Sequence, residues 1–225
     1  MRANIHEIKE EMFYKKQRVL QYTIQYPEVA SSVFSTAAAN INRYYRGKTE
    51  FFRQRLRHSL YYQAIREFDN AQENGYPFRT FEAYLGSTLT FNQDCALSLY
   101  FDAYQFTGGA HGNTTRTSDT WDLPSGRRVT MARFFPAYAM YKAYAISNVN
   151  AQITQQMQSG DGMFFEDYEI STARYFNANN FFLRPEGLVV YYQQYQIAPY
   201  ASGIPEFLLP YNKEVQRPQC RKAVT

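Results

Sequence analysis

The sequence predicts an α+β fold, in which an antiparallel sheet packs with one long N-terminal helix and a second amphipathic helix. Several segments alternate apolar and polar residues, which is the spacing of strands, and two others repeat apolar residues every three or four positions, which is the spacing of helices. The predicted strands outnumber the helices and do not alternate with them, as a parallel βαβ arrangement would require.

Two domains are expected, and the first comprises residues 1–80. Its first predicted element is a strand. Residues 18–26 alternate large apolar and polar side chains, and Pro27 is expected to interrupt the strand. The apolar positions of this strand are Leu20, Tyr22, Ile24 and Tyr26.

A long amphipathic helix is expected next. Ser31 or Ser32 is a candidate N-cap, and apolar residues recur at helical spacing over residues 34–68, with a break expected near Gly47. Residues 74–77, Asn-Gly-Tyr-Pro, are expected to stop the helix.

The second expected domain, residues 81–215, begins with two strands in residues 84–106 that are joined by a turn at residues 92–94. Residues 107–113 are expected to form a glycine-rich loop, and a polar strand follows to Leu123. The later elements are a turn at 124–126, a return strand at 127–130, a helix at 137–157, a hairpin of 180–183 with 188–192, and a short strand at 207–211. The polar segment after it, which includes a tail at 216–225, is expected to be frayed.

The composition is rich in aromatic residues and uneven in charge. The chain has 21 Tyr and 18 Phe, and the hydroxyl groups of so many tyrosines need partners or water, which weakly favours a binding protein. Residues 1–68 carry 12 Lys and Arg against 6 Asp and Glu. This excess indicates either an anionic partner or the solvated face of a helix, and we prefer the solvated face because no nucleic-acid motif accompanies it. The candidate basic patch comprises Arg43, Arg46, Arg53 and Arg57.

Cysteine content and hydropathy exclude several protein classes. No run of about 18 apolar residues is present, and residues 1–16 do not resemble a signal peptide, so a complete chain of this sequence would be expected in the cytoplasm. Two cysteines exclude a disulfide-dense scaffold. Cys95 is expected in the middle of a strand as an inert core residue, and Cys220 is expected in the polar tail.

The glycine-rich loop is the most distinctive local feature. Its glycines indicate either positive φ angles or a close approach of the backbone to a ligand or a neighbouring strand, and we prefer the structural alternative. The candidate ligand-binding residues are Gly108, Gly109, His111, Gly112, Asn113 and Tyr200.

The sequence predicts no catalytic residue, no cofactor and no metal site. Its histidines, His6, His58 and His111, have no metal-ligand spacing to each other or to a cysteine. An enzyme would need His111 close to a carboxylate, for which Asp102, Asp119 and Glu166 are the candidates.

Four segments, taken in order, resemble the DUF3298 family, and residues 18–75 resemble less specifically the preceding part of the DUF4163/DUF3298 pair. The four segments are residues 106–113 (FTGGAHGN), the turn at 122–126, residues 181–188 (FFLRPEGL) and residues 195–205 (YQIAPYASGIP). The resemblance covers about residues 80–215 and implies an RsiV-like fold.

The resemblance implies a non-enzymatic module. In this family, the extracytoplasmic part of the anti-sigma factor RsiV binds lysozyme, and related domains accompany peptidoglycan deacetylase modules whose catalysis lies elsewhere. It therefore implies a binding or sensing module of the cell envelope, whose partner is a lysozyme-like protein or a cell-wall fragment. Two alternatives stay open: a cell-wall hydrolase or deacetylase that uses His111, and an anionic-polymer binder that uses the basic patch. Nucleic acid is not expected as a partner, and the sequence does not define the oligomeric state.

Overall fold

The structure, a computed structural model, describes residues 1–220 in two compact units. Unit 1 comprises Met1–Ser87 and Phe101–Thr115, and unit 2 comprises Thr88–Tyr100 and the described residues from Arg116 onward. No helix within residues 1–220 is both long enough and apolar enough to cross a membrane.

A six-stranded sheet has the order β1-β2-β3-β4-β5-β6, and its three strands β3, β4 and β5 contribute residues to both units. The strands are β1 (Arg2–Tyr14), β2 (Gln17–Ala30), β3 (Phe81–Gln93), β4 (Ala96–Phe106), β5 (Asn113–Asp122) and β6 (Arg127–Arg128). The α+β class is confirmed. The sheet is mixed instead of wholly antiparallel, because the long helix between β2 and β3 returns the chain to the same end of the sheet, and these two strands pair in parallel.

The N-terminal hairpin departs from the prediction in two ways. β1 was not predicted, because its charged residues hide the alternation that marks a strand. β2 also continues through Pro27, which faces Ile5 of β1 in the register, so the expected interruption is wrong. Pro27 is tolerated there because the pairing of β2 with β3 covers only Leu20–Ile24, and this part of β2 does not need a second backbone donor.

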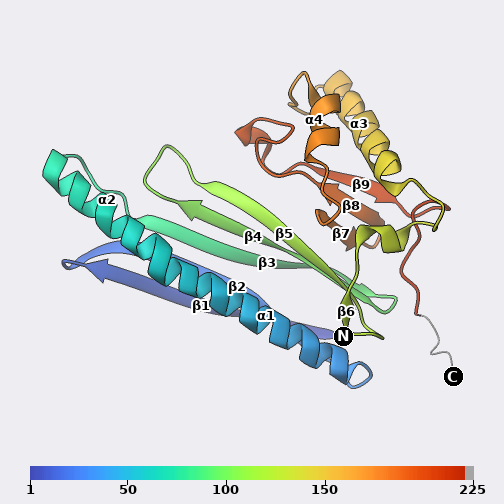
Figure 1. Ribbon diagram of the computed structural model, residues 1–225, viewed down its shortest axis with the longest axis horizontal. Coiled ribbons are helices and arrows are strands. Elements are labelled where there is room, and N and C mark those ends of the chain that lie inside the picture. Colours follow the sequence, from blue (N-terminus) through green and yellow to red (C-terminus); the bar gives the residue numbers. More distant parts are fainter. Residues whose placement is uncertain (221–225) are drawn as a thin grey trace. The chain divides into compact units, whose positions relative to one another are not determined.

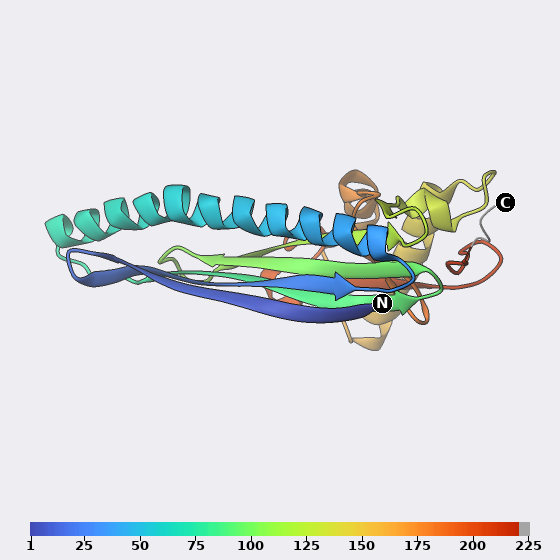
Figure 2. The same cartoon turned by 90° about the horizontal axis from the view of Figure 1, so that it is seen from below.

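The predicted long helix is confirmed, and it is continuous where a break was expected. α1 (Ser35–Arg55) passes through Gly47, and a π-helical turn at Leu56–Leu60 joins it to α2 (Tyr61–Asn74). Gly47 therefore does not interrupt the helix, because packing of the apolar face outweighs the small helical cost of one glycine. Figures 1 and 2 show this helix along one side of the strands of unit 1.

The two ends of the helix are stabilised differently. No side chain caps its N-terminus, but the Phe34 backbone N–H, one residue before α1, donates a hydrogen bond to Ser31 Oγ at 2.9 Å. The expected capping role of Ser31 or Ser32 is therefore wrong in detail. The predicted stop is confirmed by Gly75, whose φ of 71° is the left-handed conformation common after a helix.

The core of unit 1 lies between this helix and the sheet. The buried residues of α1, at positions 37, 38, 41, 45 and 49, recur at steps of one, three or four. Tyr45 is fully buried, and the centre of its ring lies 5.3 Å from that of Phe101 on β4. One face of the sheet is thus covered by apolar packing, and its other face lies away from the helix.

Unit 2 confirms most of the predicted C-terminal elements. It contains α3 (Tyr141–Ser159), α4 (Tyr168–Tyr175), and a three-stranded sheet of β7 (Phe181–Arg184), β8 (Gly187–Tyr191) and β9 (Glu206–Pro210). Gly160 ends α3, close to the predicted end of this helix at residue 157, and α4 was not predicted. The return strand is shorter than predicted, since β6 contains two residues.

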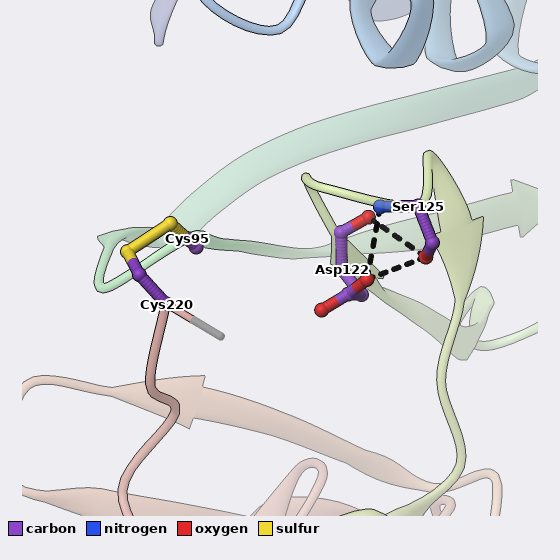
Figure 3. Close-up of a disulfide and its surroundings, with 4 residues drawn as sticks. All are labelled: Cys95, Asp122, Ser125 and Cys220. Carbon is purple, nitrogen blue, oxygen red and sulfur yellow. Dashed lines mark hydrogen bonds between the residues drawn. A yellow bond between two sulfur atoms is a disulfide. The ribbon is translucent and has the colours of Figure 1, made fainter. Parts of the chain in front are cut away.

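The two cysteines correct two predictions. Cys95 lies in the turn between β3 and β4, not in the middle of a strand, and it forms a disulfide with Cys220 (Figure 3). The preceding segment is also held in place: Val215 is fully buried, and Arg217 Nε donates to Asp94 Oδ2 at 2.6 Å. The described part of the expected frayed tail is therefore ordered, and residues 221–225 lie outside the described residues. Beside the disulfide, Asp122 accepts hydrogen bonds from Ser125 in the predicted turn.

Candidate ligand-binding groove

A groove of about 550 Å³ lies on the sheet of unit 1. Its walls come from four strands, β1 to β4. The lining residues are Lys9, Glu10, Glu11, Gln21, Tyr22, Thr23, Glu82, Ala83, Tyr84 and Tyr104.

The strand register places the groove on the sheet face away from the helix, which we call the open face. Gln21 of β2 pairs with Glu11 on one side and with Glu82 on the other, and Thr23 pairs likewise with Lys9 and Tyr84. Neighbouring residues along a strand point to opposite faces. The residues between them, such as Tyr22 and Ile24, are buried on the helix side, so the pairs around Gln21 and Thr23 lie on the open face.

Polar side chains on the open face are linked by hydrogen bonds. Gln21 Nε2 donates to Glu82 Oε1 at 2.7 Å, and the Tyr84 hydroxyl donates to Gln25 Oε1 at 2.8 Å. Amide, carboxylate and hydroxyl groups offer both donors and acceptors, so this lining suits a ligand that is itself rich in hydroxyl or amide groups.

Two ion pairs reduce the negative charge of the open face. Arg18 pairs with Glu11 at 2.6 Å, and Lys9 pairs with Glu7 at 2.7 Å. The hydrogen bond from Lys9 lowers the pKa of Glu7, and the same contact raises the pKa of Lys9. With Glu82 added, the three carboxylates still exceed the two cations.

The rings of Tyr84 and Tyr104 in the groove each lie against a glycine. A Cβ atom added at Gly86 would lie 2.8 Å from Cε1 of Tyr84, and one added at Gly112 would lie 2.3 Å from Cε2 of Tyr104. Real Cβ atoms do not approach other atoms so closely, so any side chain at Gly112 would move the Tyr104 ring. Both rings therefore take their positions because glycine leaves the space.

This contact assigns a structural role to one member of the predicted glycine-rich site. Gly112 is buried against Tyr104, whereas His111 is exposed and its Nδ1 lies 2.9 Å from the carbonyl oxygen of Gly112. Gly108 has a φ of 91°, and Arg79 donates to the carbonyl of Gly109 at 3.2 Å. The loop is thus a turn fixed from within unit 1, and its exposed part is the tip.

Two of the predicted ligand-binding residues lie outside this turn. Asn113 is exposed and begins β5. Tyr200 belongs to unit 2, where its ring packs on Tyr195 with 5.8 Å between the ring centres. Neither residue lines the groove.

The predicted basic patch is divided between two environments. Arg43 and Arg46 are exposed on α1. Arg53 binds Glu10 of β1 at 2.5 Å, and Arg57 lies 3.9 Å from the same carboxylate. Half of the patch is therefore paired with a carboxylate within its own unit.

The candidate residues of the catalytic alternative belong to different units. His111 and Asp102 belong to unit 1, whereas Asp119 and Glu166 belong to unit 2. Asp119 is buried and accepts a hydrogen bond from Arg128 at 3.0 Å. In residues 1–220, no group of three or more His, Cys, Asp or Glu is placed to hold a metal ion.

None of the groove residues was predicted from the sequence to form a site. The sequence indicates this face only through the polar positions of the predicted strand at 18–26, where Gln21, Thr23 and Gln25 alternate with the apolar residues. That pattern predicted a half-exposed strand, but the neighbours of these residues depend on the parallel pairing with β3.

Two family models match the chain in succession. Residues 14–114 match a family described as Deacetylase PdaC, and residues 133–212 match one described as a protein of unknown function, DUF3298. The chain is thus similar to DUF3298 proteins over residues 133–212 and to PdaC over residues 14–114. The DUF3298 match lies in unit 2, whereas the glycine-rich loop and the groove residues of β2, β3 and β4 lie in the segment that matches PdaC.

Solved DUF3298 structures share the fold. A DUF3298 family protein from Bacteroides fragilis is 17% identical, with a TM-score of 0.71 over 93% of this chain and 90% of its own. Another from Pseudomonas aeruginosa is 18% identical, with a TM-score of 0.60 over 96% of this chain and 95% of its own. The search of curated proteins gave no match.

Proposed function

We propose that this protein is a non-catalytic binding module of the cell envelope, and that the groove on its open face takes a glycan fragment of the cell wall. The lining of the groove carries this proposal. Tyr84 and Tyr104 offer ring faces for the C–H surfaces of sugar rings, while Gln21 and Glu82 offer donors and acceptors for hydroxyl and acetamido groups.

The match to PdaC supports the same ligand class. Seven of the ten lining residues lie within residues 14–114, the segment that matches a family named for a deacetylase. A module that holds the glycan would serve such an enzyme by keeping its substrate close, which raises the local concentration without any chemistry in the module itself.

The test is cosedimentation of the purified full chain with peptidoglycan sacculi, together with calorimetry on soluble N-acetylglucosamine oligomers. We expect saturable binding that Tyr104→Ala weakens about threefold to tenfold, because one aromatic contact contributes about 0.5–1.5 kcal/mol. Tyr62→Ala is the matched control, since Tyr62 is a 55% exposed tyrosine of unit 1 on α2, away from the groove. No binding, or equal loss in both variants, would count against the proposal.

A lysozyme-like protein is the second candidate partner, favoured by the three carboxylates Glu7, Glu11 and Glu82 near the groove. Lysozyme is basic, and the formal charge of +4 on this chain opposes long-range attraction, so local complementarity would have to dominate. Interferometry with a c-type lysozyme at low and physiological salt tests this candidate. Saturable binding at physiological salt that Glu82→Gln weakens would favour the protein partner over the glycan.

The PdaC match also keeps a hydrolase or deacetylase as an alternative, with His111 and Asp102 as its candidates within unit 1. Incubation of acetylated cell-wall fragments with the native chain and with His111→Ala tests it by mass spectrometry. Product formation that depends on His111 would replace the binding proposal with an enzymatic one.

A further inference from the structure

The N-terminal strand leaves a long sheet edge open. β1 contains 13 residues and is the first strand of the sheet, and within the described residues it pairs only with β2. Its outer edge presents a row of backbone N–H and C=O groups, which can pair with another extended strand. Two apolar side chains on this strand are exposed, Ile5 at 46% and Phe13 at 54%.

We propose that a second copy of this chain occupies that edge, with the two β1 strands paired antiparallel about a two-fold axis at Ile8. A two-fold axis that relates adjacent antiparallel strands stands perpendicular to the sheet and keeps each residue on its own face. Two residues that face each other across the axis must therefore differ by an even number in the sequence. The axis accordingly passes midway between the two copies of one residue of β1.

The charges of β1 distinguish between the central registers. An axis at Glu7 would place Glu7 opposite its own copy, and an axis at Lys9 would place Lys9 opposite Lys9 and Glu7 opposite Glu11. Like charges directly opposite each other destabilise a sheet.

The register centred on Ile8 has no such conflict. It places Ile8 opposite Ile8, Glu7 opposite Lys9 of the second copy, and His6 opposite Glu10 of the second copy. Arg2 then faces Tyr14 at each end, so all 13 residues of β1 have an opposite residue.

The exposure of the central charges permits this pairing. The side chains of Glu7 and Lys9 are 38% and 70% exposed, although they already pair within one chain. Both lie on the open face, so a lysine ammonium, which has three donors, can bind a carboxylate of each copy. A lysine in an edge strand normally discourages pairing. Here the opposite position of the second copy holds a glutamate.

The test is the molar mass of the full chain, measured by size-exclusion chromatography with light scattering. We expect the native chain to form a dimer, with twice the chain mass of 26.4 kDa, and Glu7→Lys or Lys9→Glu alone to shift it to monomer. The double variant Glu7→Lys/Lys9→Glu restores opposite charges across the axis and should restore the dimer. A monomeric native chain, or a dimer that both single variants leave intact, would overturn the proposal.

A cross-link tests the register independently. Ile8→Cys places two thiols opposite each other at the axis, and the described residues contain no free cysteine that could compete. We expect a covalent dimer on a non-reducing gel for Ile8→Cys and none for Asn4→Cys, because the Asn4 positions of the two copies lie far apart in this register. Circular dichroism of each variant shows whether the fold is kept. Cross-linking of Asn4→Cys but not Ile8→Cys would exclude the proposed register.

Discussion

The ring of Tyr104 lies against the backbone of Gly112, so close that no Cβ atom fits between them. This contact joins the most distinctive motif of the sequence to the groove. The motif supplies the space, and the tyrosine from the neighbouring strand fills it and lines the groove. In the proposed function, Gly112 would act on glycan binding through the position of the Tyr104 ring and not by touching the ligand.

Replacing Gly112 by alanine should weaken glycan binding as much as Tyr104→Ala does, about threefold to tenfold, because the added methyl group displaces the ring. Calorimetry with N-acetylglucosamine oligomers measures the effect. Gly109→Ala is the control in the same loop, since a Cβ there would meet no atom within 4 Å. Unchanged affinity in Gly112→Ala would show that the ring position does not matter for binding.

Alanine at two other glycines should change stability in opposite directions. A Cβ at Gly187 would lie 2.3 Å from the backbone oxygen of Leu209 in the neighbouring strand β9, so Gly187→Ala should lower the free energy of unfolding by about 1–3 kcal/mol. Gly47 lies inside α1 with open space around it, so Gly47→Ala should raise the same quantity by about 0.5–1 kcal/mol. Urea denaturation followed by circular dichroism gives both values, and equal signs would contradict this account.

Reduction of the Cys95–Cys220 disulfide should destabilise unit 2. The bond joins residues 125 positions apart, and removing such a link from a small domain costs about 2–5 kcal/mol. Thermal unfolding with and without dithiothreitol measures the shift, and thiol titration reports the state of the bond. The double variant Cys95→Ser/Cys220→Ser should unfold at the lower temperature in both buffers, whereas a response of this variant to dithiothreitol would point to another cause.

The free energy of unfolding should fall as the pH rises above 10. Burial raises the pKa of Tyr192 above its ordinary value of 10.0, so the folded chain keeps a proton that the unfolded chain releases. Below pH 10 both states hold this proton, and Tyr192 contributes no pH dependence. Urea denaturation between pH 8 and pH 11 should therefore show a shallower decline for Tyr192→Phe than for the native chain, and parallel declines would refute the assignment.

The sequence was sufficient to predict those helices and strands whose apolar residues recur at regular spacing. The helix from Ser35 to Asn74 was predicted because its buried side chains, such as Ile41 and Tyr45, recur at helical steps, and Gly75 supplied the stop. The expected break at Gly47 failed because a local preference for disorder at one glycine is weaker than the packing of the whole helix face.

The pairing of segments that lie far apart in the chain could not be predicted from the sequence. β1 carries charges on both faces, and its strand character appears only when Ile8 and Met12 pair with β2. The groove could not be predicted because Gln21 meets Glu82 only through the parallel register of β2 with β3. The local pattern of a single strand does not contain this register. The disulfide could not be predicted for a similar reason, since Cys95 and Cys220 lie 125 residues apart.

The separation of the two cysteines also sets an order of events during synthesis. The chain emerges N-terminus first at about 5–20 residues per second, so Cys95 waits on the order of ten seconds for Cys220 to appear. Both cysteines of these 225 residues belong to this one bond, so pairing among them has no alternative. Maturation of unit 2 thus requires an oxidant but no reshuffling of bonds. The disulfide can form only after every strand of both sheets has been synthesised.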